Sequence, residues 1–247
     1  MKKNLLLMAA TSIALASCSP TSQKEAAQDF IGKQEISIDQ KVLTPEALWA
    51  MGRIGEINVS PKGDKIAYSV GYYSVAQNRS HRVIYTMNSD GTNKQLLTQS
   101  EKSESSPVWI EGGKKIAYLA SYKSVNTLWV MNADGSEKTV VDTEKGNKIT
   151  IDAFKFSPDK SKLLYIAQVK SGERTVDQHP DLPLASGKVI TSLMYKHWDE
   201  WVESVPHPFV AAFEDNKIGA STDLLEGEPY ESPMKPFGGI EQLAWSP

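Results

Sequence analysis

The sequence predicts an all-β fold, namely an incomplete β-propeller with about three four-stranded blades and the start of a fourth. Two observations lead to this prediction: a strand–turn–strand unit recurs along the chain, and a second hairpin unit recurs between its copies. A period of about 45–50 residues with four strands in each unit is typical of propeller blades. The alternative is a β-sandwich with coincidental turns, but sandwiches do not repeat at the level of sequence.

The first recurring unit is a strand, a turn and a second strand that ends in tyrosine. Its copies span residues 57–68, 107–118 and 154–165, and a fourth copy begins at 243–247. Three of these copies, the first, third and fourth, contain Ser-Pro, in which proline presets the backbone angle of the second turn position. The unit therefore predicts the first two strands of each blade.

The second recurring unit is a hairpin that turns at Asp-Gly. It occurs at residues 84–91 and again at 128–135, so that the two Asp-Gly pairs lie 44 residues apart. Asp-Gly between two apolar runs is a strong short-range hairpin signal, because both residues tolerate positive φ. This unit predicts the outer half of a blade.

The third copy departs from the pattern because about 42 extra residues interrupt it. The insertion runs roughly from 170 to 207, and the interrupted strand resumes at 209–213. Between 190 and 202 the apolar residues recur every three or four positions, which predicts a short helical insertion in the third blade.

The N-terminus has the pattern of an export signal. Lys2 and Lys3 precede an apolar run over residues 5–16, which is too short to span a bilayer comfortably. The run ends in Leu-Ala-Ser-Cys, similar to a bacterial lipobox, and Cys18 is the only cysteine in the chain. We expect residues 1–17 to be a lipoprotein signal peptide and Cys18 to be lipidated. The alternative is an ordinary signal peptide with an incidental cysteine.

The expected organisation of the mature chain follows from composition. Residues 18–40 are polar with few aromatics, which predicts a tether, and residues 41–247 form the partial propeller. The protein is then exported and membrane-anchored, on the periplasmic side or at the cell surface. A short helix is predicted at 43–52, with Thr44 as N-cap, Pro45 in the first turn and Gly52 as C-terminal cap.

Three stretches carry a resemblance to a known family. They are residues 43–63, the two Asp-Gly hairpins, and the insertion residues 181–183 with 194–201. They resemble the N-terminal propeller of the prolyl oligopeptidase family of serine peptidases, within its dipeptidyl peptidase and acylaminoacyl-peptidase branch. The resemblance covers essentially everything after about residue 40.

The resemblance implies a longer protein in which a hydrolase domain, expected downstream, carries the serine, aspartate and histidine. No Gly-x-Ser-x-Gly motif occurs in the 247 residues, so no catalytic residue is expected in this chain. The propeller would gate and position short peptides, from whose N-termini the enzyme releases dipeptides or blocked residues. The alternative is a non-enzymatic Tol-type propeller that binds protein partners.

The insertion contains the candidate substrate-binding residues. In dipeptidyl peptidases of this family an acidic segment of the propeller binds the α-amino group of the substrate, which makes Asp199 and Glu200 the candidates here. The alternative is a solvated helix face, with Lys196 and Glu200 as an ordinary ion pair. Trp198 and Trp201 line a substrate pocket in the first interpretation and pack the helix onto the blade in the second.

Other classes of function find no support in the composition. The formal net charge is −3 and basic residues are scattered, which gives no electrostatic footprint for nucleic acid. The four histidines, at positions 81, 179, 197 and 207, lack the spacing of zinc ligands. We expect neither a metal nor a cofactor.

Overall fold

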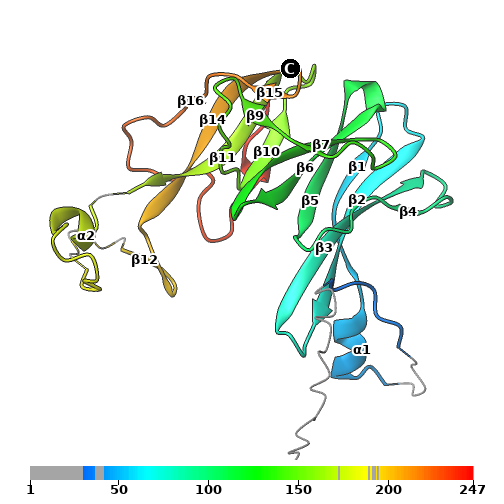
Figure 1. The fold of residues 1–247 in the computed structure, drawn as a ribbon, viewed down its shortest axis with the longest axis horizontal. Helices are drawn as coiled ribbons and strands as arrows, with labels where there is room; N and C mark the ends of the chain where they lie inside the picture. Colours follow the sequence, from blue (N-terminus) through cyan, green and yellow to red (C-terminus); the bar gives the residue numbers. More distant parts are fainter. Residues whose placement is uncertain are drawn as a thin grey trace, which may run out of the picture.

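The computed structural model describes residues 30–36, 42–171, 173–188, 190, 193 and 195–246. Strands dominate these residues, and three antiparallel sheets lie side by side (Figure 1). The prediction of an all-β, incomplete propeller is therefore confirmed, while the number of blades stays a prediction. The predicted signal peptide, Cys18 and most of the predicted tether lie outside the described residues.

The first two sheets have the strand order of propeller blades. Blade 1 consists of β1 (Arg53–Val59), β2 (Lys65–Ser74), β3 (Arg79–Asn88) and β4 (Gln95–Leu96), paired in that order. Blade 2 consists of β5 (Glu104–Ile110), β6 (Lys115–Tyr122), β7 (Val125–Asn132) and β8 (Thr139–Val140), and a 3-10 turn η1 (Glu111–Gly113) joins β5 to β6.

The third sheet keeps this order and adds a link to blade 2. Blade 3 consists of β10 (Ala153–Phe156), β11 (Lys162–Lys170), β14 (Ser204–Glu214) and β16 (Thr222–Asp223). A short strand β15 (Lys217–Ile218) pairs with β14 and, in parallel, with β9 (Asp142–Thr143), which follows blade 2 in the chain. Blades 2 and 3 are thus joined by backbone hydrogen bonds as well as by side chains.

Cross-strand aromatic pairs explain why each copy of the first unit ends in tyrosine. The tyrosine lies directly opposite an aromatic residue on the third strand of its own blade, which is where side-chain pairs stabilise a sheet most. The pairs are Tyr68 with Tyr85, Tyr118 with Trp129, and Tyr165 with Phe209, with ring centroids 5.6, 6.4 and 5.2 Å apart.

The Asp-Gly turns form as predicted, but with a different backbone from the one expected. Gly91 and Gly135 have φ of 85° and 86°, whereas neither aspartate is among the residues with positive φ. Gly91 N donates to Asn88 O at 2.9 Å, as in a type I turn followed by a left-handed glycine. Of the two residues that tolerate positive φ, only the glycine adopts it in these turns.

Apolar side chains fill the space between neighbouring blades. Ile84 of blade 1 and Trp109 of blade 2 belong to one buried cluster, and Leu128 of blade 2 and Leu163 of blade 3 belong to another. An indole bond accompanies the packing, since Trp109 Nε1 donates to Asn58 O in the preceding blade at 3.0 Å.

The C-terminal residues repeat this indole bond without forming a strand. Trp245 Nε1 donates to Lys155 O of blade 3 at 3.4 Å, at the positions of the sequence repeat that correspond to Trp109 and Asn58. Residues 243–246 belong to no strand and follow a 3-10 turn, η2 (Ile240–Gln242). The start of a fourth blade stays a prediction.

The chain enters the folded part earlier than predicted. Residues 30–36 pack against blade 1: Ile31 is buried, its carbonyl lies 3.1 Å from His81 Nδ1, and Gln34 Nε2 donates to Tyr73 O. Residues 30–36 of the predicted tether therefore belong to the folded part, because Phe30 and Ile31 supply apolar side chains that pack in the core of blade 1.

The helix predicted at 43–52 is confirmed as α1 (Pro45–Ala50), with Thr44 Oγ1 accepting from Ala47 N at 3.2 Å. Gly52 is not its cap, because the chain leaves the helix in extended geometry at Met51, where no left-handed residue is needed. Within the described part of the chain, no helix has the length and apolar character that crossing a bilayer requires.

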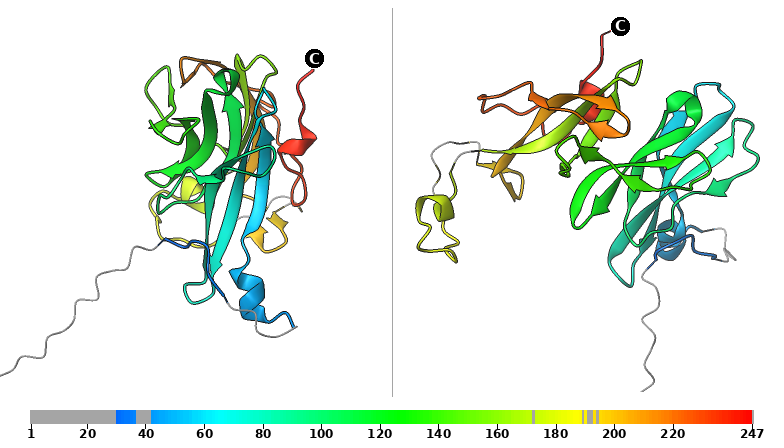
Figure 2. Two further views of the ribbon diagram at one scale, coloured as in Figure 1. Left: turned by 90° about the vertical axis from the view of Figure 1, so that its right-hand side faces the viewer. Right: turned by 45° about the horizontal axis from the view of Figure 1, so that its top comes forward.

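The insertion is shorter than predicted and differs in structure. The pairing of β11 with β14 extends as far as Lys170 opposite Ser204. The insertion therefore occupies only residues 171–203. It projects away from the three sheets, and its described residues include a short helix, α2 (Thr175–Gln178), and a hairpin formed by β12 (Lys196–His197) and β13 (Glu200–Trp201) (Figures 1 and 2).

The helix predicted over 190–202 is wrong in the part that the structure describes. Residues 195–202 form the β12–β13 hairpin, with Lys196 opposite Trp201 and His197 opposite Glu200. A spacing of three residues also separates partners across a two-residue turn, so a tight hairpin imitates the periodicity of a helix over so short a segment.

Candidate functional site

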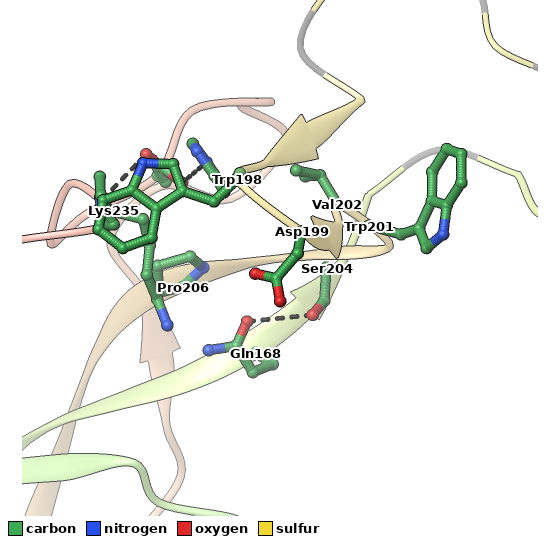
Figure 3. Close-up of a pocket in the computed structure, with 11 residues that line it drawn as sticks. Gln168, Trp198, Asp199, Trp201, Val202, Ser204, Pro206 and Lys235 are labelled. Atoms are coloured by element: carbon green, nitrogen blue, oxygen red, sulfur yellow. Dashed lines mark hydrogen bonds and ion pairs between the residues drawn. The ribbon is translucent and has the colours of Figure 1, made fainter.

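A cavity of about 450 Å³ lies beneath the β12–β13 hairpin (Figure 3). Three segments line it: the hairpin, the adjoining ends of β11 and β14, and the loop 231–237 that follows β16. Its lining residues are Gln168, His197, Trp198, Asp199, Trp201, Val202, Ser204, Pro206, Glu231, Lys235 and Pro236. Three of the four predicted substrate-binding residues are among them.

Asp199 presents a carboxylate to this cavity. It lies in the two-residue turn of the hairpin, and its side chain points into the space in front of Gln168 and Ser204 (Figure 3). Among the described residues no hydrogen bond or ion pair engages this carboxylate, whereas Ser204 Oγ donates to Gln168 Oε1 at 3.0 Å. An unengaged carboxylate at a cavity wall can accept hydrogen bonds from a cationic ligand.

The backbone of the turn is strained at the residue before Asp199. Trp198 has φ of 51°, in the left-handed region that non-glycine residues seldom adopt. Such a conformation costs free energy and persists where surrounding contacts hold it.

The aromatic residues of the hairpin are not packed onto a blade. The Trp198 side chain is 75% exposed and meets Phe237 edge to face, with ring centroids 5.6 Å apart. Trp201 contacts Tyr195 and lies under the ammonium groups of Lys188 and Lys196. The interpretation that these tryptophans pack a helix onto the blade is therefore wrong.

Glu200 is placed only in part. Its backbone belongs to β13 and pairs with His197, while its side chain lies outside what the structure describes. The expected alternative pair of Lys196 and Glu200 on a helix face is excluded, because these residues lie on the two strands of a hairpin.

The loop 231–237 supplies residues that the sequence did not indicate. Glu231 Oε2 lies 3.1 Å from His197 Nε2, and Glu231 Oε1 accepts from Lys235 N at 3.0 Å. Ser232 N donates to Pro206 O at 2.8 Å, which fixes the loop to β14. The loop belongs to no repeat, so only its placement beside the hairpin reveals that it contributes to the cavity.

Ion pairs fasten the base of the insertion. Asp177 accepts from Arg174 and from Lys170 Nζ, and these hydrogen bonds hold the pKa of its carboxyl far below the usual range. The hydrogen bond and charge of Lys188 likewise lower the pKa of Glu203. The negative charges of these two acids are therefore paired with basic residues, whereas the carboxylate of Asp199 has no partner among the described residues.

The described residues give no sign of a metal centre. No group of three or more His, Cys, Asp or Glu side chains gathers among them in a way that could hold an ion.

No family model matches the chain, but relatives match over most or all of its length. Dipeptidyl-peptidase 5 of Porphyromonas gingivalis is 40% identical over 246 residues, which cover 100% of this chain and 34% of that protein. Dipeptidyl-peptidase 5 of Porphyromonas endodontalis is 41% identical over 83% of this chain and 29% of its own length. The chain is homologous to part of dipeptidyl-peptidase 5.

The predicted resemblance is thereby confirmed. The chain spans about a third of the length of the dipeptidyl-peptidase 5 proteins that it matches. A more distant dipeptidyl-peptidase 5, from Arthroderma otae, is 26% identical over 83% of the chain and 30% of that protein.

Solved structures support the fold. The acylaminoacyl peptidase of Pyrococcus horikoshii matches with a TM-score of 0.52 at 12% identity, over 70% of this chain and 25% of that protein. An acylaminoacyl peptidase in complex with Z-Gly-Gly-Phe-chloromethyl ketone matches with a TM-score of 0.53 at 11% identity, over 71% and 26%. At this identity the likeness concerns the fold alone.

Proposed function

We propose that this chain is the propeller part of an exported, lipid-anchored serine peptidase that releases dipeptides or blocked residues from the N-termini of short peptides. One observation carries the proposal: the carboxylate of Asp199 faces a cavity and has no partner among the described residues. The relatives named dipeptidyl-peptidase 5 support a peptidase rather than a Tol-type binding propeller.

The chemistry of the cavity suits the amino end of a peptide. A free α-amino group is cationic near neutral pH and pairs with a carboxylate through charge-assisted hydrogen bonds. Asp199 would bind this group, Trp198 and Trp201 would line the pocket beside it, and Glu200 is the second candidate acid. Because the bound ammonium fixes how far the peptide enters, the propeller would set which bond reaches the hydrolase domain.

The test is the variant Asp199→Asn in the longer protein that includes the hydrolase domain. The KM for peptides with a free amino terminus should rise about tenfold, since a neutral amide replaces a hydrogen bond between charged groups. N-acetylated peptides should be cleaved as before. Asp181→Asn, an exposed acid in the same insertion, is the matched control. An unchanged KM in Asp199→Asn would remove the amine-binding role.

A second experiment addresses the missing catalytic residues. The 247-residue protein should show no hydrolysis of dipeptidyl substrates, whereas the longer protein that contains the hydrolase domain should cleave them. Activity of the short chain would contradict the assignment of all catalytic residues to downstream sequence.

The proposed anchor is tested separately. Cys18→Ser should abolish incorporation of labelled fatty acid and move the protein from the membrane fraction to the soluble fraction, because thioether formation needs the thiol. Ser17→Ala keeps a small residue before the cysteine and serves as the control. A Cys18→Ser protein that stays in the membrane fraction would contradict the proposal.

A further inference from the structure

We propose that Glu231 is a positioning residue, which holds Asp199 in the cavity by binding the neighbouring His197. This inference rests on the proposed function, because Asp199 is assigned there as the amine-binding acid. It adds a residue from the loop 231–237 that no sequence pattern indicates, and it states how that residue affects the affinity for substrate.

A single carboxylate bridges two segments that lie 34 residues apart in the chain. Glu231 Oε2 lies 3.1 Å from His197 Nε2, and since a carboxylate only accepts, the imidazole must donate here. The other carboxylate oxygen, Glu231 Oε1, accepts from Lys235 N, so the carboxylate is itself held in one orientation. Both side chains are largely buried, at 23% exposure for His197 and 18% for Glu231.

The hairpin depends on this support because it has little of its own. Its strands are two residues each, and even longer isolated two-stranded hairpins are marginal in water. Its turn also contains the left-handed Trp198, a conformation that needs external contacts to persist.

At the turn end of the hairpin, these contacts come from the loop 231–237. His197 binds Glu231, and the next residue, Trp198, meets Phe237 of the same loop edge to face. The loop is in turn fixed to β14 by the bond from Ser232 N to Pro206 O. The position of Asp199, the residue after Trp198, therefore follows from the loop.

The kinetic test uses Glu231→Ala in the longer, hydrolase-containing protein. Its KM for peptides with a free amino terminus should rise about tenfold while kcat changes less than about twofold, because the acid is displaced rather than removed. In Glu231→Gln the single amide oxygen can accept from Lys235 N, while the amide NH2 can donate to Nε2 of His197 in its other tautomer, so KM should return to within about threefold. Glu226→Ala, an exposed acid earlier in the same connecting segment, is the matched control.

A double-mutant cycle shows whether Glu231 acts through Asp199. In the Asp199→Asn background, adding Glu231→Ala should raise KM no further. An equal additional rise in that background would show that Glu231 affects binding directly or through the fold, and would overturn the inference.

Hydrogen exchange gives a readout that does not depend on catalysis. Amide exchange over residues 195–202 should become faster in Glu231→Ala and stay slow in Glu231→Gln, since the hairpin includes the bond from Val202 N to Tyr195 O. Unchanged exchange in Glu231→Ala overturns the inference whatever Asp199→Asn does. If exchange is faster but Asp199→Asn leaves KM unchanged, the support of the hairpin by Glu231 stands and the proposed amine-binding role falls.

Discussion

The blades and the insertion use acidic turn residues in opposite ways. In the blades, Asp90 and Asp134 each accept hydrogen bonds from the backbone and hydroxyl of the residue two positions on, and Asp159 does the same with Ser161. In the insertion, Asp199 also lies in a tight turn, yet no described residue engages it. A carboxylate that closes its own turn has little capacity left for a ligand, whereas Asp199 retains all of its own.

The aromatic residues show the same division. In the blades they form cross-strand pairs that pack against the core, such as the buried Tyr118 with the partly buried Trp129. In the insertion Trp198 remains 75% exposed beside a cavity. Similar residue types thus stabilise the scaffold in one region and stay available for binding in the other, and the distinction depends on their partners rather than on their spacing.

The largest expected effect comes from breaking a blade pair. Tyr118→Ala removes a side chain that is 2% exposed and should lower the free energy of unfolding by about 3–5 kcal/mol, through lost burial and a cavity. Trp198→Ala should change it by less than about 0.5 kcal/mol. Urea unfolding of both variants checks this, and equal losses would erase the contrast between blade and insertion aromatics.

A smaller effect is expected at a buried acid of blade 2. Burial raises the pKa of Glu104, although a hydrogen bond from Ser100 opposes the shift. The ionised form is therefore disfavoured in the folded state, and Glu104→Gln should stabilise the protein by roughly 1 kcal/mol at pH 7.

The pH dependence of stability tests whether the charge of Glu104 destabilises the folded protein. A raised folded pKa makes the wild-type protein gain stability as the pH falls through that value towards about 4.3, the ordinary pKa of glutamate. The advantage of Glu104→Gln should shrink over this interval in unfolding experiments. A variant that is less stable than wild type at pH 7 would show that the charge is well accommodated.

The next effect concerns a blade turn. Hydrogen bonds from Ser157, which has the larger effect, and from Ser161 lower the pKa of Asp159 to about 2. Asp159→Asn should therefore destabilise the protein at pH 7, but less than Tyr118→Ala does, because the site is exposed. The difference from wild type should disappear as the pH falls from about 4 through about 2, where the carboxylate is protonated. A difference that is independent of pH would contradict the role of the charge.

The smallest effect on stability is expected at Asp199, where a roughly tenfold effect on KM is proposed. Asp199→Asn should leave the melting temperature and the free energy of unfolding unchanged, to within about 0.5 kcal/mol, since the carboxylate has no described partner to lose. Thermal unfolding of the two proteins side by side is sufficient. A clear loss of stability would mean that Asp199 closes its turn as the blade aspartates do.

The blades could be predicted from the sequence because their determinants are local and repeated. The Ser-Pro and Asp-Gly turns and the tyrosine of each first unit lie at fixed offsets, and the structure places each of them in a turn or a cross-strand pair. The insertion could be located for the same reason, as an interruption of the period.

The inside of the insertion could not be predicted in the same way. Its hairpin is so short that its spacing fits a helix equally well, and contacts from distant residues decide between the two. The family resemblance indicates Asp199, whereas Glu231 lies far from it in the sequence and comes close to the hairpin only in the folded structure.

The docking of Ile31 on blade 1 limits how far the protein can stand from a membrane. If Cys18 carries the proposed lipid, only 11 residues lie between it and Phe30, where the described part of the chain begins. Fully extended, they reach about 40 Å. The folded body would then stay within about 40 Å of the bilayer surface and could not move further into the surrounding solution.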